Sequence, residues 1–458
     1  MKGKISRRKF MGGAAALGAG AAMATGGAAQ EAKIDISFKK DFKAPDKCFM
    51  DQYYDGMLKI AQDIRNTQVE NIAKAMEKAF ELRQKGGRIY SHVLVGHFAM
   101  FTGSPDLPGQ PNLLPQRVDR REREDFAAMK KGDFLLTNGL SGVKEARDKG
   151  VYVVGIANNY VANAKTAPGG LTRMDVKIED VCDMVVDSQV PWYNGLVNAP
   201  QLPQFRPIPS SGTVMALIYW AMTASLANLV GTKGKGKSAE PVEKYLDLAI
   251  DRFRMIGTDR PKIDRVTEKW ADLVLGEKAR FLVYGHPQQV EPYEGTKNMF
   301  VNEAYIVASG TMIADLYDLR AKEMKKNDIL LIGGFTSDNA DEIKVARHGK
   351  SVGAYTVAFC PFATDGDASG LRLFKEVDDA FNTYSDESEG VIAVPGFPKK
   401  VSPLTGVTGN MVHWLLMAQW TDHMARRGEF PYFWQGYHET GGSTYGKMVK
   451  PYFDQRGY

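Results

Sequence analysis

The chain has 458 residues, with 59 lysines and arginines against 54 aspartates and glutamates, which gives a formal charge of +5. The positive excess lies within the first nine residues, and no acidic residue precedes Glu31. The rest is therefore close to neutral, which argues against nucleic acid or an anionic membrane surface as a partner. The 3 cysteines are too few and too scattered for a disulfide framework or a thiolate metal site.

Residues 1–30 have the pattern of an export signal. Arg7 and Arg8 are followed by a weakly apolar glycine and alanine stretch over residues 12–29. That stretch is too short and too rich in small residues to span a bilayer stably. It ends in residues suited to cleavage near Ala24 or Ala29. The sequence predicts a twin-arginine signal peptide, a periplasmic or secreted protein and no stable membrane insertion after cleavage. An uncleaved anchor is the alternative.

The remaining chain contains two similar halves, displaced by roughly 195 residues. The clearest pair is Lys131–Ser141 with Lys326–Thr336, each an apolar strand that runs into a glycine-containing loop. Other segments match in the same order. Short continuous apolar strands that alternate with helical stretches predict parallel sheets covered on both faces. We therefore expect an α/β protein with two three-layer α/β/α domains, arranged as a pseudo-dimer.

The expected division follows from this repeat. It gives an N-terminal segment 31–49, a first domain 50–230, a linker 231–240, a second domain 241–428 and an aromatic tail 429–458. The linker contains a string that fits a phosphate-binding loop, Gly231–Ser238. An apolar helix precedes it in place of a strand, and Pro241 follows where a helix should begin, so we expect only a flexible basic connection. No dinucleotide motif follows a strand, and no cofactor is expected.

The order of the segments resembles the SIS (sugar isomerase) domain family in tandem, as in the isomerase half of glucosamine-6-phosphate synthase. The segments that carry this resemblance are Gly86–Tyr90, Lys131–Asp133, Asn138–Gly142, Val154–Ile156, Val181–Asp187 and Ser210–Thr213. It covers most of residues 50–428 and implies the phosphosugar-binding type of domain. The chain departs from the family after the first strand of each half, where His97 and His286 stand in place of a turn rich in Gly and Ser or Thr.

A ligand site is expected where the parallel strands end, because helix N-termini bring unpaired N–H groups to that edge of a sheet. The candidate ligand-binding residues in the first half are Asn138, Gly139, Ser141, Gly142, Ser210, Ser211 and Thr213. Those in the second half are Gly334, Thr336, Ser337, Asn339 and Thr408. Ser141, Ser211 and Thr408 could equally be helix N-caps and nothing more, with Thr408 opening the last long helix.

Interconversion of an aldose and a ketose needs a base and an acid. Four candidate catalytic residues are His97 and His286, just past strand ends, and Glu145 and Glu342, in first helical turns. Each has a plainer explanation, as a hydrogen-bonded histidine or as an acid favoured by the helix dipole. Glu303 and His438 are further candidates, and the resemblance implies that the aromatic tail, with Tyr437 and Glu439, could fold over the site.

These observations predict an exported protein that binds a carbohydrate derivative, a sugar or sugar phosphate, and leave homodimerisation open. The first alternative is an aldose–ketose isomerase that uses Glu and His. A second is a calcium-dependent scaffold module, because Asp365–Gly370 with Glu376 has calcium-loop spacing. Arg372 at an apolar position and the absence of an entering helix oppose calcium.

Overall fold

The fold is described from a computed structural model. It describes residues 44–92, 113–114, 116–118, 123–139, 142–157, 178–191, 195–201, 206–285, 304–306, 324–334, 336–363, 370–386, 390–431 and 433–435.

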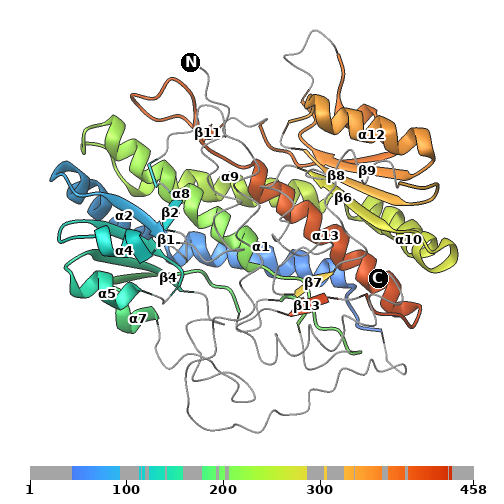
Figure 1. Ribbon diagram of the computed structural model, residues 1–458, viewed down its shortest axis with the longest axis horizontal. Coiled ribbons are helices and arrows are strands. Elements are labelled where there is room, and N and C mark those ends of the chain that lie inside the picture. The colour runs from blue at the N-terminus through green and yellow to red at the C-terminus, as the bar shows by residue number, and fades with distance from the viewer. Residues whose placement is uncertain are drawn as a thin grey trace, which may run out of the picture.

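Two separate parallel sheets form the frame of the molecule (Figure 1). The first has the order β2-β1-β3-β4-β5, with β1 Ile89–His92, β2 Gln116–Val118, β3 Phe134–Thr137, β4 Tyr152–Ala157 and β5 Met184–Asp187. The second has the order β10-β9-β8-β6, with β6 Phe281–Gly285, β8 Ile329–Gly333, β9 Tyr355–Cys360 and β10 Asp379–Asn382. The predicted α/β class with parallel sheets is confirmed.

Two short antiparallel pairs complete the strands of the described residues. They are β11 Gly390–Ile392 with β12 Val401–Pro403, and β7 Ala304–Ile306 with β13 Phe433–Gln435.

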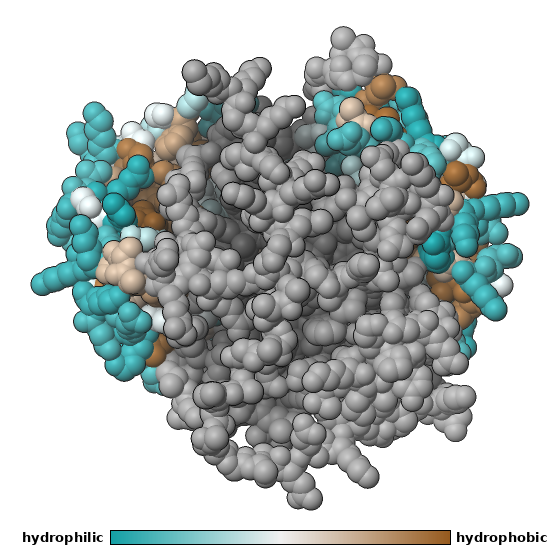
Figure 2. Space-filling view, in the orientation of Figure 1, coloured by the Kyte–Doolittle hydropathy of each residue, from teal (hydrophilic) through white to brown (hydrophobic). Residues whose placement is uncertain are grey.

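Long helices fill the space between the sheets, and shorter ones cover their outer faces (Figure 1). The long helices are α1 Phe49–Thr67, α2 Val69–Gln84, α8 Ser211–Gly231, α9 Ala239–Gly257, α10 Arg260–Glu277 and α13 Thr405–Arg426. The outer elements are α4 Arg123–Ala128, α5 Val143–Asp148, α7 Ile178–Val181, α12 Ala340–Val352 and the 3₁₀ turn η5 Leu373–Lys375. At both flanks of the molecule the described residues present mainly hydrophilic side chains, with scattered apolar ones (Figure 2).

The strands bury both faces, and alternate residues enter different cores. Phe134 and Leu136 of β3 join the large central core, whereas Leu135 joins a smaller outer core under α5 and α7. In the second sheet, Leu331 of β8 faces the central core and Leu330 faces the outer core under α12. This alternation is the expected consequence of the two-residue period of a strand.

Helix α8 is apolar around its whole circumference. It is the one helix of the described residues that is long and apolar enough to cross a bilayer, and 83% of its most apolar window is buried inside the fold. It packs against α2, α9 and α13. Its composition is therefore explained by its central position, since a helix buried on all sides needs no polar face.

The connection between α8 and α9 differs from the expected flexible linker. The Thr232 hydroxyl accepts a hydrogen bond from the backbone N–H of Gly236 (2.8 Å), and Asn228 donates its side-chain amide to the Lys237 carbonyl (2.9 Å). Pro241 lies in the first turn of α9, where a missing N–H costs nothing. The segment is a hydrogen-bonded turn between two helices, and the expectations of flexibility and of no helix at Pro241 were wrong.

The two halves share one buried hydrogen bond at corresponding places. The Tyr53 hydroxyl of α1 donates to the Pro209 carbonyl (3.2 Å), and the Tyr245 hydroxyl of α9 donates to the Pro403 carbonyl (2.9 Å). Each proline precedes a central helix and follows a residue with positive φ, Ile208 at 65° and Ser402 at 61°. Such backbone is strained for a residue other than glycine, so the tyrosines help to hold it.

We expect Tyr53→Phe and Tyr245→Phe each to lower the free energy of unfolding by about 1–3 kcal/mol, because each leaves a buried carbonyl without its donor. Urea unfolding monitored by fluorescence measures the effect. Tyr152→Phe is the matched control, since the Tyr152 hydroxyl has no hydrogen bond to the described residues. Equal losses in all three variants would contradict the role given to the two tyrosines.

Candidate functional site

The loop after β8 brings four of the predicted ligand residues to the carboxyl end of the second sheet. The backbone N–H of Gly334 donates to the Phe359 carbonyl (2.9 Å), and the buried Ser337 donates its hydroxyl to the Ala363 carbonyl (3.3 Å). Asn339 caps α12, because its side-chain oxygen accepts from the N–H groups of Asp341 (2.9 Å) and Glu342 (3.2 Å). Thr336 lies in the same loop and is partly exposed.

Glu342 is the most unusual residue of this loop region. Its side chain is 2% exposed, and its Oε2 atom has no hydrogen-bond partner among the described residues. Burial raises the pKa of its carboxyl well above the ordinary value, and the nearby charges of Asp338 and Asp341 act in the same direction. The neutral acid is therefore favoured, and it can donate a hydrogen bond.

The carboxyl of Glu342 lies against the backbone of Gly334. A Cβ atom at position 334 would lie 2.9 Å from Oε2 of Glu342, and 2.8 Å from the carbonyl oxygen of Thr336. Both distances are too short for a side chain at this position. The glycine thus leaves the space that the acid occupies beside the end of β8.

The corresponding loop of the first half is built differently. The Thr137 hydroxyl accepts from the N–H of Gly139 (3.0 Å), and Asn138 is 3% exposed. Gly142, at φ +74°, precedes α5. Glu145 is exposed and forms an ion pair with Lys149 (2.9 Å), so it has the environment of an ordinary first-turn acid.

The starts of the two central helices are buried. Ser210, Ser211 and Thr213 are fully buried at the start of α8, and Ser210 makes no side-chain capping bond. In the second half α13 begins at Thr405, so the prediction that Thr408 opens this helix was wrong. The Thr408 hydroxyl donates back to the Leu404 carbonyl (3.0 Å), one turn earlier, which is a common bond for a threonine inside a helix.

Several predicted residues lie outside the described residues. They are His97, Ser141, His286, Glu303, Tyr437, His438, Glu439 and the segment 364–369 of the proposed calcium loop. Glu376, the last ligand of that loop, instead binds Arg347 through both oxygens, at 2.9 and 3.0 Å. The described residues contain no group of three or more His, Cys, Asp or Glu side chains that could hold a metal ion.

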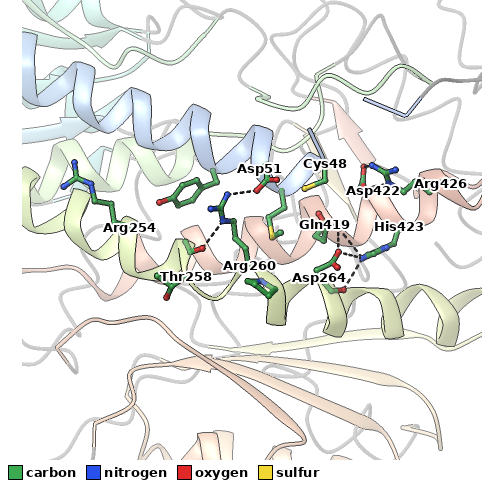
Figure 3. A pocket seen from close by; sticks show the side chains of 14 residues that line it. Cys48, Asp51, Arg254, Thr258, Arg260, Asp264, Gln419, Asp422, His423 and Arg426 are labelled. Carbon is green, nitrogen blue, oxygen red and sulfur yellow. Dashed lines mark hydrogen bonds and ion pairs between the residues drawn. The ribbon is translucent and has the colours of Figure 1, made fainter. Parts of the chain in front are cut away.

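A second feature, which the sequence did not reveal, is a pocket of about 790 Å³ at the C-terminal end of α13 (Figure 3). It is formed by the start of α1, the turn from α9 into α10 and the last turns of α13. Its lining residues are Cys48, Met50, Asp51, Tyr54, Arg254, Gly257, Thr258, Arg260, Pro261, Asp264, Gln419, Asp422, His423 and Arg426. None of the predicted site residues lines it. Lysine, arginine, aspartate and glutamate occur on α13 only as Asp422 and Arg426, in its last turns, so the sequence contains no local signal of the pocket.

No family model and no curated protein matches the chain. Solved structures similar to it include a proposed sugar-binding protein from Salmonella typhimurium LT2, at 13% identity and a TM-score of 0.44, with 81% of this chain and 98% of that chain covered. Another is the C-terminal domain of glucosamine-fructose-6-phosphate aminotransferase from Francisella tularensis, at 9% identity and a TM-score of 0.44, with 83% of this chain and 98% of that chain covered. A third is tagatose-6-phosphate ketose/aldose isomerase from Escherichia coli, at 11% identity and a TM-score of 0.40, with 85% of this chain and 97% of that chain covered. These identities and TM-scores are too low to support an argument about this chain. Its fold class is assigned from the pairing of its own strands.

We expect Glu342→Gln to stabilise the protein relative to the parent chain by an amount that grows with pH. At low pH both side chains are neutral. As pH rises above 4.5, the ordinary pKa of the group, the unfolded parent chain loses a proton that the folded chain retains, so folding weakens by up to about 1.4 kcal/mol per pH unit. The effect levels off above the folded pKa.

Urea unfolding of both chains from about pH 4 to 8 measures this difference. Glu145→Gln is the control, because it removes one exposed carboxylate at the corresponding place in the first half. A Glu342→Gln difference that does not change with pH would show that the buried carboxyl ionises normally.

Proposed function

We propose that this chain is an exported protein of two tandem SIS-like domains that binds a carbohydrate derivative at the carboxyl ends of its strands. The observation that carries the proposal is the buried Glu342 carboxyl beside Gly334, where β8 ends. Parallel α/β sheets bind small ligands at this edge. A neutral acid held there can donate a hydrogen bond to a sugar oxygen.

The charges around the second-half loop favour a neutral sugar over its phosphate. The N–H groups of Asp341 and Glu342, which could otherwise receive an anion, are already bound to the Asn339 side chain. The carboxylates of Asp338 and Asp341 lie at the same helix start and would repel a phosphate. We therefore assign an uncharged sugar or polyol to this loop.

Isothermal titration calorimetry with neutral hexoses, amino sugars and their phosphates tests this assignment. We expect a neutral sugar to bind, and Glu342→Met to weaken it by about threefold to tenfold, because methionine has a similar length but no O–H donor and a hydrogen bond between neutral groups is worth about 0.5–1.5 kcal/mol. Glu145→Gln should leave the affinity unchanged. Binding of phosphates alone, or equal effects of the two variants, would contradict the assignment.

Glu342 also favours a second candidate function, an aldose–ketose isomerase. A carboxyl with a raised pKa keeps its proton at a higher pH than an ordinary glutamate does, so it can serve as a general acid. In deuterated water, NMR would then detect exchange of the proton at carbon 2 of a bound sugar. We expect Glu342→Gln to slow this exchange by about 100-fold or more while binding persists. Binding without any exchange in the parent chain would leave a binding protein only.

The export part of the proposal rests on Arg7 and Arg8. Replacing both by lysine keeps the charge of the leader but removes the arginine pair that the twin-arginine route reads. We expect the double variant to remain in the cytoplasmic fraction as the uncleaved chain, whereas the parent chain is recovered from the periplasm or medium in a shortened form. Lys2 and Lys4 changed to arginine serve as the control. Normal export of the double variant would rule out this route.

A further inference from the structure

The chain beyond its leader is close to neutral, but its charge is not evenly distributed over the fold. In the turn between α8 and α9 lysine alternates with glycine, and Lys233, Lys235 and Lys237 are all exposed. None of these three ammonium groups has an ion-pair partner among the described residues. The turn therefore presents three uncompensated positive charges.

A loop from the second half of the chain brings two more lysines to the same place. A Cβ atom at Gly231 would lie 1.7 Å from the Pro395 carbonyl oxygen, so the loop between β11 and β12 packs directly on the start of the turn. That loop carries Lys399 and Lys400, which are both exposed. Figure 1 shows the loop and the turn beside one another at the upper left of the molecule.

Helix α2 lies against another side of the turn. A Cβ atom at Gly234 would lie 2.9 Å from the ring of Phe80, and the Ser238 hydroxyl donates to the carboxylate of Glu77 (2.5 Å). Arg83 follows Phe80 by three residues, so it lies on the same face of α2, and it is exposed. A guanidinium thus joins the lysines on this side of the molecule.

Positive charge exceeds negative charge where these three segments meet. In the second half of α2, Glu81 is already paired with Lys78 (2.9 Å) and Lys85 (2.5 Å), which leaves the carboxylate of Glu77. The first turn of α9 adds the carboxylate of Glu240. Against these two carboxylates stand the six exposed cationic residues that we call the basic flank: Lys233, Lys235, Lys237, Lys399, Lys400 and Arg83.

The turn cannot hold a single phosphate through its backbone, although its sequence fits a phosphate-binding loop. The N–H groups of residues 233–236 already donate within the turn, at 2.8–3.2 Å, to Leu229, Val230 and Thr232. A phosphate-binding loop acts through N–H groups that are free to point at the anion. Any anion bound here must therefore be held by the side chains.

The basic flank also lacks rings on which nucleic-acid bases could stack. Phe80 and Phe397 are both partly buried and pack against the central core. Proteins that bind single strands combine a basic groove with exposed aromatic rings. Ammonium groups on separate loops at one side of the molecule match a broad anionic surface instead, because each lysine can contact it independently.

We propose that the basic flank binds the surface of a bilayer that contains anionic phospholipid. Each lysine near such a surface contributes about fivefold in affinity, and the attraction falls off within about 8–10 Å at physiological salt. The large apolar side chains that the described residues expose, Met255, Phe362 and Leu371, all lie outside the flank. The flank therefore rests on the headgroups by charge, without an apolar group that enters the bilayer.

Sedimentation with vesicles tests the proposal on the full chain, with the lysines and arginines of residues 2–9 replaced by glutamine so that the leader adds no charge. The probes are vesicles of phosphatidylcholine alone and vesicles with about one-third phosphatidylglycerol. We expect binding at least tenfold tighter to the anionic vesicles, and its loss in about 1 M salt, where the Debye length is about 3 Å. Equal binding to the two kinds of vesicle, or none to the anionic ones, overturns the proposal.

Variants in the same background then locate the surface. Glutamine at all three lysines of the turn (Lys233→Gln, Lys235→Gln, Lys237→Gln) should weaken binding to the anionic vesicles by about tenfold or more. The control removes the same charge from exposed lysines at the N-terminal edge of the second sheet: Lys278→Gln, Lys325→Gln and Lys326→Gln. It is matched in backbone as well, because Lys233 and Lys278 both have positive φ, 55° and 53°.

Circular dichroism checks that both triple variants fold, and we expect the control to bind as the parent does. A loss in the turn variant no greater than that in the control would overturn the proposal. Binding of heparin by the parent chain without binding of anionic vesicles would assign the basic flank to a polyanionic chain and overturn it as well.

Discussion

The structure depends on the burial of two apolar central helices, α8 and α13, between two parallel sheets. Both helices are buried along almost their whole length, and α13 packs against α1, α8, α9 and α10. Neither half can therefore complete its core alone, because α1 precedes the first sheet in the chain yet packs on α13, which follows the second. The free energy that holds the halves together is the same hydrophobic burial that folds each of them.

This shared core determines where chemistry can occur. Each sheet has one face on the central helices and one on short outer helices, so its side chains on both faces are used in packing. Only the ends of the strands and of the helices are left with side chains that packing does not use. Glu342 lies in the first turn of α12 with its carboxyl against Gly334, whereas Glu145 lies in the first turn of α5 and pairs with Lys149 in solvent. The two loops thus differ in the burial of the same residue type.

The sequence was sufficient to predict the fold class, because a strand buried on both faces leaves an unbroken apolar run, as in Ile329–Gly333. It was also sufficient to place Glu342 near a strand end. It could not distinguish Glu342 from Glu145, since both follow a glycine loop in the first turns of a helix. That distinction depends on tertiary burial, which changes the pKa of one carboxyl and not the identity of either residue.

The helix boundaries show a similar limit. Threonine is a common N-cap residue, but the Thr408 hydroxyl donates to the Leu404 carbonyl one turn earlier. The helix begins at Thr405. The basic string over residues 231–238 has the composition of a flexible linker. Two hydrogen bonds, one accepted by the Thr232 hydroxyl and one donated by the Asn228 amide, nevertheless close it into a turn. Ion pairs such as Arg260 with Asp51 join residues 209 positions apart, and no local pattern can reveal them. The pocket they line was consequently invisible before the fold was known.

Helix α13 passes close to the carboxyl end of β9 and ends at the pocket. The ring of His413 lies 6.0 Å from that of Phe359, near the carboxyl end of β9, while Gln419 and His423 line the pocket further along the helix. Burial lowers the pKa of His413 to about 3, so this part of the helix stays uncharged inside the core at neutral pH. Because the helix is packed on four others along its length, its polar side chains are held in place before any ligand arrives. Side chains held in this way lose little conformational freedom when a ligand contacts them.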